Sequence, residues 1–388
     1  RRRLGSGAYR VDQCLLTIDA GTTAIKACLF DEGGQLLATS VQEYTLLTPG
    51  PDAVELPAES YWQATVAAIR EVTATAPGAQ IEGVSVTSQG ETIVAVDRTG
   101  TALRHAIVWL DNRPAEQAAY VAERIGNREF YAVTGLPEVV PTWPACKILW
   151  LREHEPQVFA QAARFLLLED YLLYRLCGEF VTEGSACTST GYFDIRTGGW
   201  WPRMLELVGI EPGSLPRLAR SGEIAGNVTS RAAQETGLPT TARVVTGAMD
   251  QVAAAIGSGN VAPGVVTETT GTALVLATTV DEPTYDPLAR VPCYYHALPG
   301  KYLLLPYSQT AGMAFRWFRD AFARDGEDYD SLSALAGEVA PGSDGLVMLP
   351  HLTGSTSPDF NPRAKGVFYG IALRHRRAHF VRAIFEAV

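Results

Sequence analysis

The sequence predicts an α/β protein built from two domains. Apolar runs with high β-propensity alternate with helical patterns in its first part, an order typical of α/β domains. The chain has 388 residues, which favours two domains over one. A Gly- and Thr-rich hairpin signal occurs early in each half, at 15–30 and at 267–275. We therefore expect domains at residues 11–246 and 247–388.

Composition and charge narrow the class of partner. Hydrophobic residues make up 47% and charged residues 19%, which predicts a folded core. The net charge of −10 disfavours nucleic acid or an anionic membrane as a partner. The six cysteines are scattered without a CxxC pair, and no apolar run approaches the roughly 18 residues of a spanning helix. No secretory signal precedes Asp12, so we expect a cytoplasmic protein.

Residues 15–30 predict a β-hairpin whose tip suits phosphate. Asp19 ends the first apolar run and Lys26 lies in the second. The turn between them consists of Gly21, Thr22 and Thr23. Backbone N–H groups, hydroxyls and an ammonium suit phosphate oxygens, while the Asp19 carboxylate suits a hydrated Mg²⁺. The alternative is an ordinary β-turn with a solvated aspartate.

A third strand and a helix follow this hairpin. Residues 35–44 predict the third strand of a meander. Ser60 is placed to cap a helix that carries Trp62 and Ile69 on its apolar face. Residues 81–88 predict a buried strand.

Polar side chains follow two of the predicted strands, where ligands gather in α/β sheets. Gln89 and Glu91 follow the first of these strands, and Trp109 stands at the end of the second. Asp111 and Arg113 come directly after it. Trp109 offers a flat apolar face to sugar C–H groups, and the polar side chains offer partners to hydroxyl groups. The alternative is that Trp109 belongs to the core and that Asp111 caps a helix.

The segment from Val244 predicts a strand, a glycine, an aspartate and a small-residue helix. Asp250 stands at the junction of strand and helix, followed by Gln251. A carboxylate in this position can act as a general base. The alternative is that Asp250 only caps the helix.

The second hairpin signal resembles the first by its placement. Gly271 and Thr272 form its tip, so the two tips are candidates for binding one phosphate chain. Gly312 precedes a predicted helix, and the N-terminus of a helix favours anions. Two helical patterns lie between the hairpins: an ordinary amphipathic helix at 141–154, which contains Lys147, and a helical region at 158–176.

Two segments resemble the signatures of the FGGY carbohydrate kinases. Lys147-Ile-Leu-Trp-Leu-Arg-Glu-His154 resembles the core of the first signature, although Thr142 departs from it. Gly366-Val-Phe-Tyr-Gly-Ile371, seven residues and then His379-Phe-Val-Arg-Ala-Ile-Phe-Glu386 resemble the second. The resemblance covers about residues 12–388. It implies two actin-like/ribonuclease-H-like ATPase domains with a central cleft.

The resemblance also implies site residues and cofactors. Asp250 matches the base that deprotonates the attacking sugar hydroxyl, and Asp19 matches the acidic residue beside Mg²⁺. ATP is the implied phosphoryl donor. The positions that match phosphate or nucleotide contacts are Gly21, Thr22, Thr23, Lys26, Gly271, Thr272 and Gly312. The positions that match the sugar site are Gln89, Glu91, Trp109, Asp111 and Gln251.

The substrate is narrowed by two segments. Gln89-Gly-Glu-Thr92 is closer to the Gln-Arg-Glu-Thr of glycerol kinases than to the Gln-Met-His-Gly of xylulokinases. Gly90, however, replaces the arginine expected in a glycerol kinase, and residues 343–371 lean toward xylulokinases. We therefore expect a pentulose or related polyol as substrate, xylulose first, with glycerol as the alternative.

The resemblance implies that the second domain is incomplete. Members of the family continue beyond the second signature into an adenosine-binding region, so the apolar side chains of residues 378–388 would pack against that region. A truncated, non-catalytic sugar-binding or regulatory protein is therefore the alternative function class. An actin-like structural ATPase is disfavoured by the sugar-site residues. The expected partner is a small sugar or polyol, and a homodimer is one candidate assembly.

Overall fold

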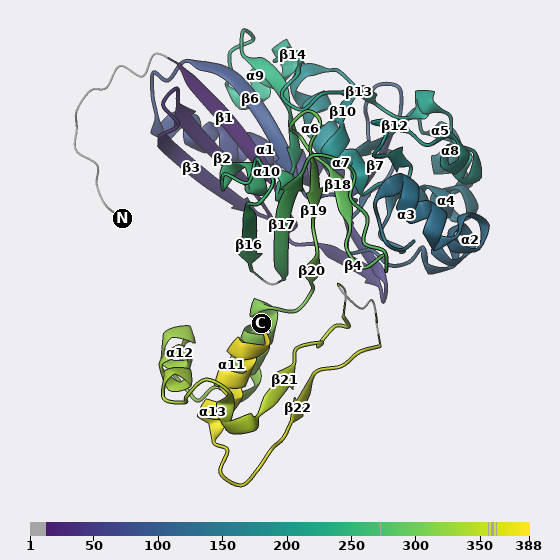
Figure 1. Cartoon of the computed structure of the whole chain (residues 1–388). Helices are drawn as coiled ribbons and strands as arrows, with labels where there is room; N and C mark the ends of the chain where they lie inside the picture. Colours follow the sequence, from purple (N-terminus) through teal and green to yellow (C-terminus); the bar gives the residue numbers. More distant parts are fainter. Residues whose placement is uncertain (1–12, 272, 356, 358–360, 362) are drawn as a thin grey trace. The chain divides into compact units, whose positions relative to one another are not determined.

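The structure is a computed structural model that describes residues 13–271, 273–355, 357, 361 and 363–388 (Figure 1). Two compact units divide the chain. The first comprises the residues up to Gly257 together with Tyr294–Tyr302, and the second comprises Ser258–Cys293 and Leu303–Val388. The domain ranges expected from the sequence, 11–246 and 247–388, stay predictions.

The main sheet of the first unit has the strand order β14-β15-β6-β1-β2-β3. Its strands are β1 (Cys14–Ala20), β2 (Ala24–Asp31), β3 (Leu36–Glu43), β6 (Ile81–Ser88), β14 (Ile224–Asn227) and β15 (Arg243–Met249). β1, β6 and β15 run parallel to one another, whereas β2, β3 and β14 are antiparallel to their neighbours. The carboxyl ends of β1, β6 and β15 therefore meet at one edge.

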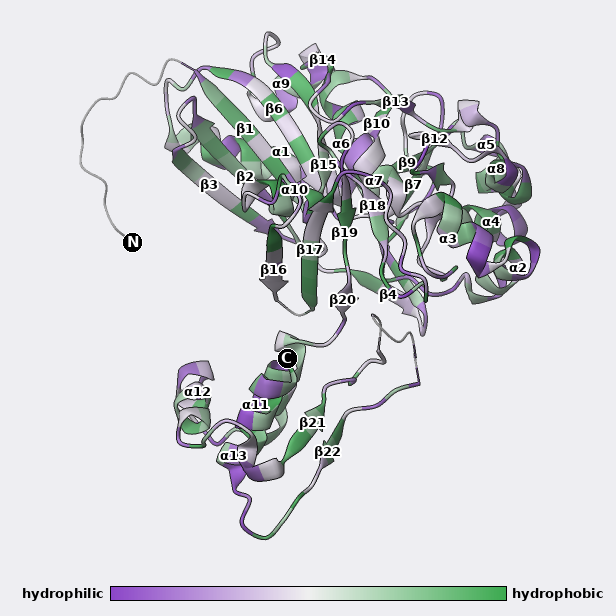
Figure 2. Cartoon of the chain, viewed as in Figure 1, coloured by the Kyte–Doolittle hydropathy of each residue, from purple (hydrophilic) through white to green (hydrophobic). Residues whose placement is uncertain are grey.

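Alternating side chains explain how this sheet is covered. In β1 the buried residues Cys14, Leu16, Ile18 and Ala20 alternate with more exposed ones, as expected of a strand with one face on the core. Figure 2 shows β1 as predominantly hydrophobic. Helix α1 (Ala58–Thr75) packs against β2 and β3, and α6 (Leu168–Cys177) packs against β6 and β15. The predicted meander and the strand at 81–88 are confirmed.

Two details of the predicted helices were wrong. Ser60 does not cap the first helix, because α1 already begins at Ala58 after Pro57, and the Ser60 N–H donates to the Pro57 carbonyl at 2.9 Å. The region 158–176 is not one helical region. It contains the end of α5 (Pro156–Gln161), the strand β9 (Arg164–Leu167) and most of α6.

The remaining elements of the first unit surround this core. A second sheet contains β4 (Leu47–Gly50), β5 (Ala53–Leu56), β8 (Ala106–Ile107), β7 (Ile93–Val96) and β9, in that order. Smaller pairs are β10 (Val181–Glu183) with β13 (Arg217–Ala219), and β11 (Phe193–Asp194) with β12 (Gly199–Trp200). The other helices are α2 (Ala115–Ile125), α3 (Asn127–Thr134), α4 (Pro144–His154), α7 (Gly184–Thr188), α8 (Pro202–Val208), α9 (Ser230–Thr236), α10 (Asp250–Gly257) and the 3₁₀ turn Pro212–Ser214.

The second unit contains a small sheet and a helical cluster. The strand order of this sheet is β16 (Val266–Thr270), β17 (Leu274–Val280), β19 (Tyr302–Leu304), β18 (Cys293–Tyr295), and β20 (Tyr307–Ser308) also pairs with β17. Tyr294 and Tyr295 of β18 and Tyr302 of β19 belong to the first unit. The other elements are α11 (Gly312–Phe322), α12 (Tyr329–Gly337), the 3₁₀ turn Ser343–Gly345, β21 (Val347–Leu349) paired with β22 (Val367–Tyr369), and α13 (Arg377–Ala387). β16 and β17 confirm the second predicted hairpin.

The last helix packs partly within its own unit. Val381 and Ile384 of α13 are buried in a cluster with Phe318 of α11 and Leu332 of α12. The ring of Phe385 lies 4.7 Å from that of Phe315, although Phe385 is partly exposed. Packing within the unit therefore accounts for Val381 and Ile384, whereas Phe385 and Val388 remain exposed, and their packing against an adenosine-binding region stays a prediction.

Candidate active site

The tip of the first hairpin has the predicted geometry. Asp19 of β1 pairs across the hairpin with Lys26 of β2, and the Lys26 Nζ lies 3.9 Å from the Asp19 Oδ2. The turn closes through the Gly21 N–H, which donates to the Ala24 carbonyl at 3.0 Å. The Tyr44 hydroxyl donates to the Gly21 carbonyl. The tip is thus held from two sides, while Asp19 and Lys26 remain about half exposed.

The three parallel strands end at the same level. Ala20 of β1 is paired with Ser88 of β6, which is paired in turn with Met249 of β15. The residues that follow these three are Gly21, Gln89 and Asp250. The pairing of the main sheet therefore brings together three groups of predicted site residues from distant parts of the chain.

Gln89 presents a buried acceptor at this edge. Its side chain is only 4% exposed. The Nε2 donates weakly to the Tyr61 hydroxyl at 3.4 Å, while the Oε1 has no hydrogen-bond partner among the described residues. A buried amide oxygen without a partner is costly, so a ligand hydroxyl placed here would be favoured. Sequence reasoning missed Tyr61, which orients this amide.

The loop after Gln89 is shaped by close packing. A Cβ atom on Gly90 would lie 2.8 Å from the Ser189 Oγ. Glu91 adopts a left-handed conformation with φ of 57°. Burial raises the pKa of the Glu91 carboxyl, against the opposing effects of Ser189 and Lys147. Ser189 was also missed, because a serine in the middle of the chain carries no signal of its own.

Trp109 connects the predicted sugar and phosphate residues. Its indole N–H donates to the Thr22 Oγ1 at 2.9 Å, and its backbone N–H donates to the Thr92 Oγ1 at 3.1 Å. Trp109 is partly exposed and packs against the main core. The indole is therefore both a core side chain and a support for the tip of the first hairpin.

Asp111 is occupied by bonds within the chain. Its carboxylate is fully buried and accepts hydrogen bonds from the Val54 N–H at 2.7 Å and from the Arg113 guanidinium at 2.6 Å. The same Arg113 also pairs with Glu55 at 2.7 Å. Asp111 therefore fixes the loop that follows β8, and Arg113 balances its charge.

Lys147 is a further candidate site residue, which the sequence placed in an amphipathic helix and in the first signature-like segment without assigning it a role. Residues 144–149, the first half of helix α4, are all buried, so Lys147 does not lie on a solvent-exposed polar face. The Lys147 ammonium donates to the carbonyls of Glu91 at 2.8 Å and Val108 at 3.0 Å. It thus joins the two loops that carry the predicted sugar-binding side chains. A lysine flanked on all sides by apolar residues was the available signal.

Asp250 lies where the sequence predicts it, at the first position of α10 after β15. Its Oδ1 accepts a hydrogen bond from the Gln251 N–H at 2.6 Å, within the first turn of its own helix. Burial raises the pKa of Asp250 to about 7, and the negative charges of Glu91 and Asp19 contribute to the rise. A carboxyl group with this pKa can take up a proton near neutral pH. Gln251 is partly buried beside it.

Two of the predicted nucleotide contacts come together in the second unit. The Gly312 N–H donates to the Gly271 carbonyl at 3.0 Å, and a Cβ atom on Gly312 would lie 2.3 Å from that oxygen. Both glycines line a pocket of about 270 Å³ with Met313, Phe315, Arg316 and Tyr329. Gly312 begins α11, as predicted. Thr272 lies outside the described residues.

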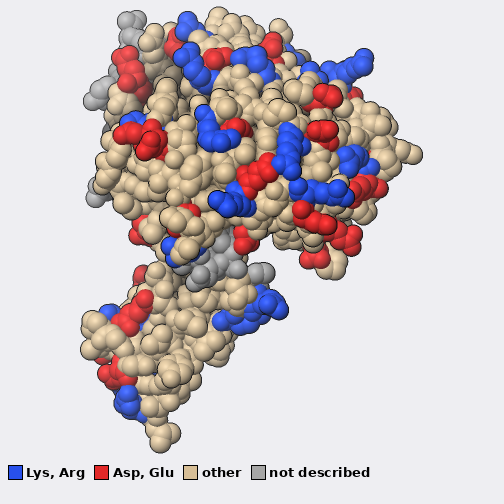
Figure 3. Space-filling view, turned by 45° about the vertical axis from the view of Figure 1, so that its right-hand side comes forward, with Lys and Arg blue, Asp and Glu red and all other residues tan. Residues whose placement is uncertain are grey.

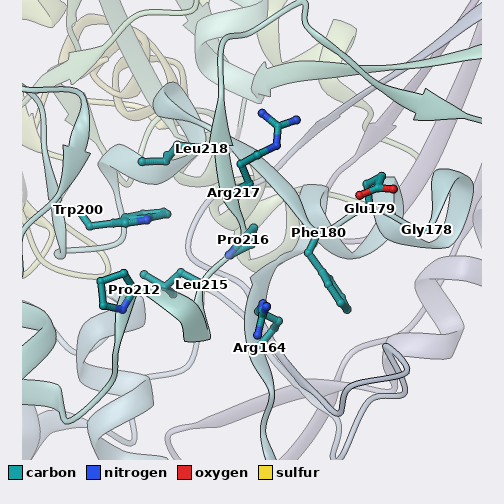
Figure 4. Close-up of a pocket in the computed structure, with 10 residues that line it drawn as sticks. All are labelled: Arg164, Gly178, Glu179, Phe180, Trp200, Pro212, Leu215, Pro216, Arg217 and Leu218. Carbon is teal, nitrogen blue, oxygen red and sulfur yellow. The ribbon is translucent and has the colours of Figure 1, made fainter.

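A larger pocket of about 480 Å³ lies elsewhere in the first unit (Figure 4). It is lined by Arg164, Gly178, Glu179, Phe180, Trp200, Pro212, Leu215, Pro216, Arg217 and Leu218. None of these is a predicted site residue. Arg217 is paired with Glu223 at 2.9 Å, and the Arg164 guanidinium lies over the Phe180 ring.

The surface, the side-chain clusters and the helices add three observations. On the face shown in Figure 3, Lys and Arg side chains lie interspersed with Asp and Glu. Within the described part of the chain, no group of three or more His, Cys, Asp or Glu side chains could hold a metal ion. No helix of that part is long and apolar enough to cross a membrane.

Comparison with known proteins decides the family. Residues 14–257 match the N-terminal domain of the FGGY family of carbohydrate kinases, and residues 266–388 match its C-terminal domain. The chain belongs to the FGGY family of carbohydrate kinases. Its fold is accordingly the two-domain, actin-like fold of FGGY kinases, as expected from the two signatures.

Relatives of this FGGY kinase carry two substrate names. A gluconokinase of Bacillus subtilis is 31% identical over 96% of this chain and 74% of its own length. A xylulose kinase of Lactococcus lactis is 30% identical over the same shares. A crystal structure of gluconate kinase from Lactobacillus acidophilus has a TM-score of 0.91 and 26% identity, and the match covers 97% of this chain and 76% of that one.

We predict that Lys147→Met weakens sugar binding. Methionine keeps the length of the side chain but leaves the carbonyls of Glu91 and Val108 without their donor. We expect about a tenfold weaker affinity for the preferred sugar, and a free energy of unfolding lower by roughly 2 kcal/mol, as for a buried group left unpaired. Calorimetric titration and urea denaturation measure the two quantities.

The exposed Lys365 provides the control, because Lys365→Met removes the same charge without breaking a buried bond. If the Lys147→Met protein is destabilised but binds sugar with unchanged affinity, Lys147 does not position the two loops for sugar binding. Its role would then be limited to stabilising the fold.

Proposed function

We propose that this FGGY kinase transfers the γ-phosphoryl group of ATP to a hydroxyl of a pentulose, xylulose first. The observation that carries the proposal is Asp250, a carboxyl group at the end of a parallel strand with a pKa raised to about 7. It stands level with the residues that follow β1 and β6. A base, a phosphate-binding tip and polar side chains for hydroxyls thus lie at one sheet edge.

Asp250 accepts the proton of the attacking hydroxyl. A general base is most effective when its pKa lies near the working pH, because it is then ionised and still basic enough to take the proton. The reaction joins the sugar oxygen to the γ-phosphorus, breaks the bond to the bridging oxygen of ADP, and leaves the proton on Asp250. Positioning and neutralisation of charge supply most of the remaining catalysis.

The first hairpin supplies the phosphate contacts in this proposal. Gly21, Thr22 and Thr23 offer N–H and hydroxyl groups, and Lys26 offers an ammonium. Gly271, Thr272 and Gly312 supply the nucleotide contacts of the second unit.

Asp19 would hold a Mg²⁺ ion that accompanies ATP. Its carboxylate is 44% exposed at the end of β1, and burial of the rest raises its pKa. A single carboxylate suits Mg²⁺, which is commonly bound by one or two carboxylates together with substrate phosphates and water. When bound, the ion neutralises phosphate charge.

Local charge favours a neutral sugar over a sugar acid. Three carboxylates, those of Asp19, Glu91 and Asp250, interact at this edge. The Lys147 ammonium is bonded to two carbonyls, and Arg113 is paired with two carboxylates. The carboxylate of gluconate would meet like charges here, whereas the hydroxyls of a pentulose would not.

Gluconate is the second candidate, because a gluconokinase is as similar to this chain as a xylulose kinase. Glycerol is disfavoured. The arginine of the glycerol kinase segment has no room at Gly90, where even a Cβ atom would approach Ser189 to 2.8 Å.

We predict that Asp250→Asn lowers turnover by roughly 100-fold or more while sugar affinity is largely kept, because the amide preserves the shape but cannot accept the proton. A coupled assay measures turnover, and calorimetry measures affinity. The control is Asp31→Asn at the other end of the hairpin. Near-normal turnover of the Asp250→Asn protein would refute Asp250 as the base.

We predict that xylulose binds at least ~100-fold more tightly than gluconate, which corresponds to about 2.8 kcal/mol of charge repulsion. Titration calorimetry without nucleotide compares xylulose, gluconate and glycerol. Glu91→Gln should narrow the difference, because it removes one of the repelling charges. Tighter binding of gluconate would overturn the choice of substrate and leave the kinase class intact.

A further inference from the structure

An extra residue in β15 lies directly before Asp250. Thr246 is paired with Val86, and the next paired residue of β15 is Met249, which is opposite Ser88. Strand β15 therefore advances three residues where β6 advances two. Such a bulge bends a strand and changes the direction of the side chains that follow.

The bulge depends on a glycine. A Cβ atom on Gly247 would lie 1.8 Å from the Val86 carbonyl oxygen, a distance that no side chain tolerates. Gly247 thus allows the backbone of β15 to approach that of β6 closely. Three backbone groups at the bulge have partners outside the ladder, as buried backbone polar groups require.

Side chains outside the site bind all three groups. The Gly247 N–H donates to the Glu169 Oε1 at 3.0 Å. The Ala248 carbonyl accepts a hydrogen bond from the Thr87 Oγ1 at 2.6 Å. The Met249 N–H donates to the Ser185 Oγ at 3.0 Å. The three residues before Asp250 are therefore held individually.

Two of these three hydrogen bonds lead to buried carboxyl groups, one directly to Glu169 and the other through Ser185 to Glu183. The Ser185 hydroxyl donates a hydrogen bond to the Glu183 Oε1 at 2.6 Å, and Glu183 also accepts one from the Ser221 hydroxyl. Glu169 and Glu183 are both fully buried. The Glu169 Oε2 has no hydrogen-bond partner among the described residues, so Gly247 is the only hydrogen-bond partner recorded there for this carboxyl group.

We propose that Glu169 is a positioning residue for the base Asp250. It orients Asp250 by accepting a hydrogen bond from the Gly247 N–H. Ser185, supported by Glu183, holds the Met249 N–H in the same way. This inference rests on the proposed function, because it takes Asp250 to be the base. A base displaced by about 1 Å loses on the order of 100-fold in rate.

The chemistry of Glu169 decides how to test it. Burial, with Glu183 and Asp170 nearby, raises the pKa of the Glu169 carboxyl group well above its usual value, which favours its neutral form. Glutamine has the shape of a neutral glutamic acid and keeps the acceptor oxygen. Methionine has a similar length and no such acceptor. Glu169→Gln should therefore preserve the contact that Glu169→Met removes.

The first experiment is a double-mutant cycle in the full chain. We expect Glu169→Met to lower turnover by ~10- to 100-fold with unchanged sugar affinity. Glu169→Gln should stay within about threefold of the unaltered chain, since it keeps the hydrogen bond. If Glu169 acts through Asp250, adding Glu169→Met to Asp250→Asn lowers turnover no further. Additive losses would show a general structural role and overturn the proposal.

The matched control is Asp170→Ala. Asp170 is equally buried and accepts the Leu167 N–H at the start of α6, but its recorded contacts do not include β15. Asp170→Ala should lower the free energy of unfolding without changing turnover. The comparison with Glu169→Met therefore distinguishes general destabilisation from misplacement of the base.

The second experiment does not depend on activity. Hydrogen exchange followed by mass spectrometry measures protection of the amides in residues 244–250. Glu169→Met should accelerate exchange in this segment by at least ~10-fold, and Glu169→Gln should not. Equal exchange in both variants would overturn the inference. If Asp250→Asn keeps its turnover, the proposed function fails instead, while the exchange experiment still reports whether Glu169 holds the bulge.

Discussion

The parallel pairing of β1, β6 and β15 is the constraint on which the site depends. These strands end level with one another, so the residues that follow them meet without any long loop. The arrangement concentrates negative charge, because Asp19, Glu91 and Asp250 belong to the same edge. Burial raises the pKa of Asp250 to about 7, and the neighbouring negative charges of Glu91 and Asp19 add to the rise.

Neighbouring groups in the first unit offset part of the repulsion between these carboxylates. Lys147 compensates part of the charge of Glu91 from a buried helix while it joins two loops through their carbonyls. Trp109 connects the second of these loops to Thr22 at the tip of the first hairpin. The residues proposed for the sugar and those proposed for phosphate are thus joined by hydrogen bonds within the first unit.

Local patterns were sufficient to predict much of this framework. The first hairpin and the placement of Asp250 between strand and helix follow from short-range periodicity and turn chemistry, and the structure has both. The two signatures predicted the family, which the comparison confirmed. The parts that could not be predicted depend on contacts between distant residues. Nothing near Glu169 indicates that it binds Gly247, since β9 is too short to show a period and α6 is buried on most sides. The assignment of site residues to chemical roles stays a proposal.

The most direct test of the account is the pKa of the Asp250 carboxyl group. Infrared difference spectra of the chain labelled with ¹³C-aspartate, with Asp250→Asn as the reference, report its protonation as pH is raised. The account predicts a midpoint near pH 7. It also predicts a lower midpoint when Asp19→Asn or Glu91→Gln removes a neighbouring negative charge. A midpoint near pH 4 that neither substitution moves would show that the strand ends do not tune Asp250, and would contradict the account.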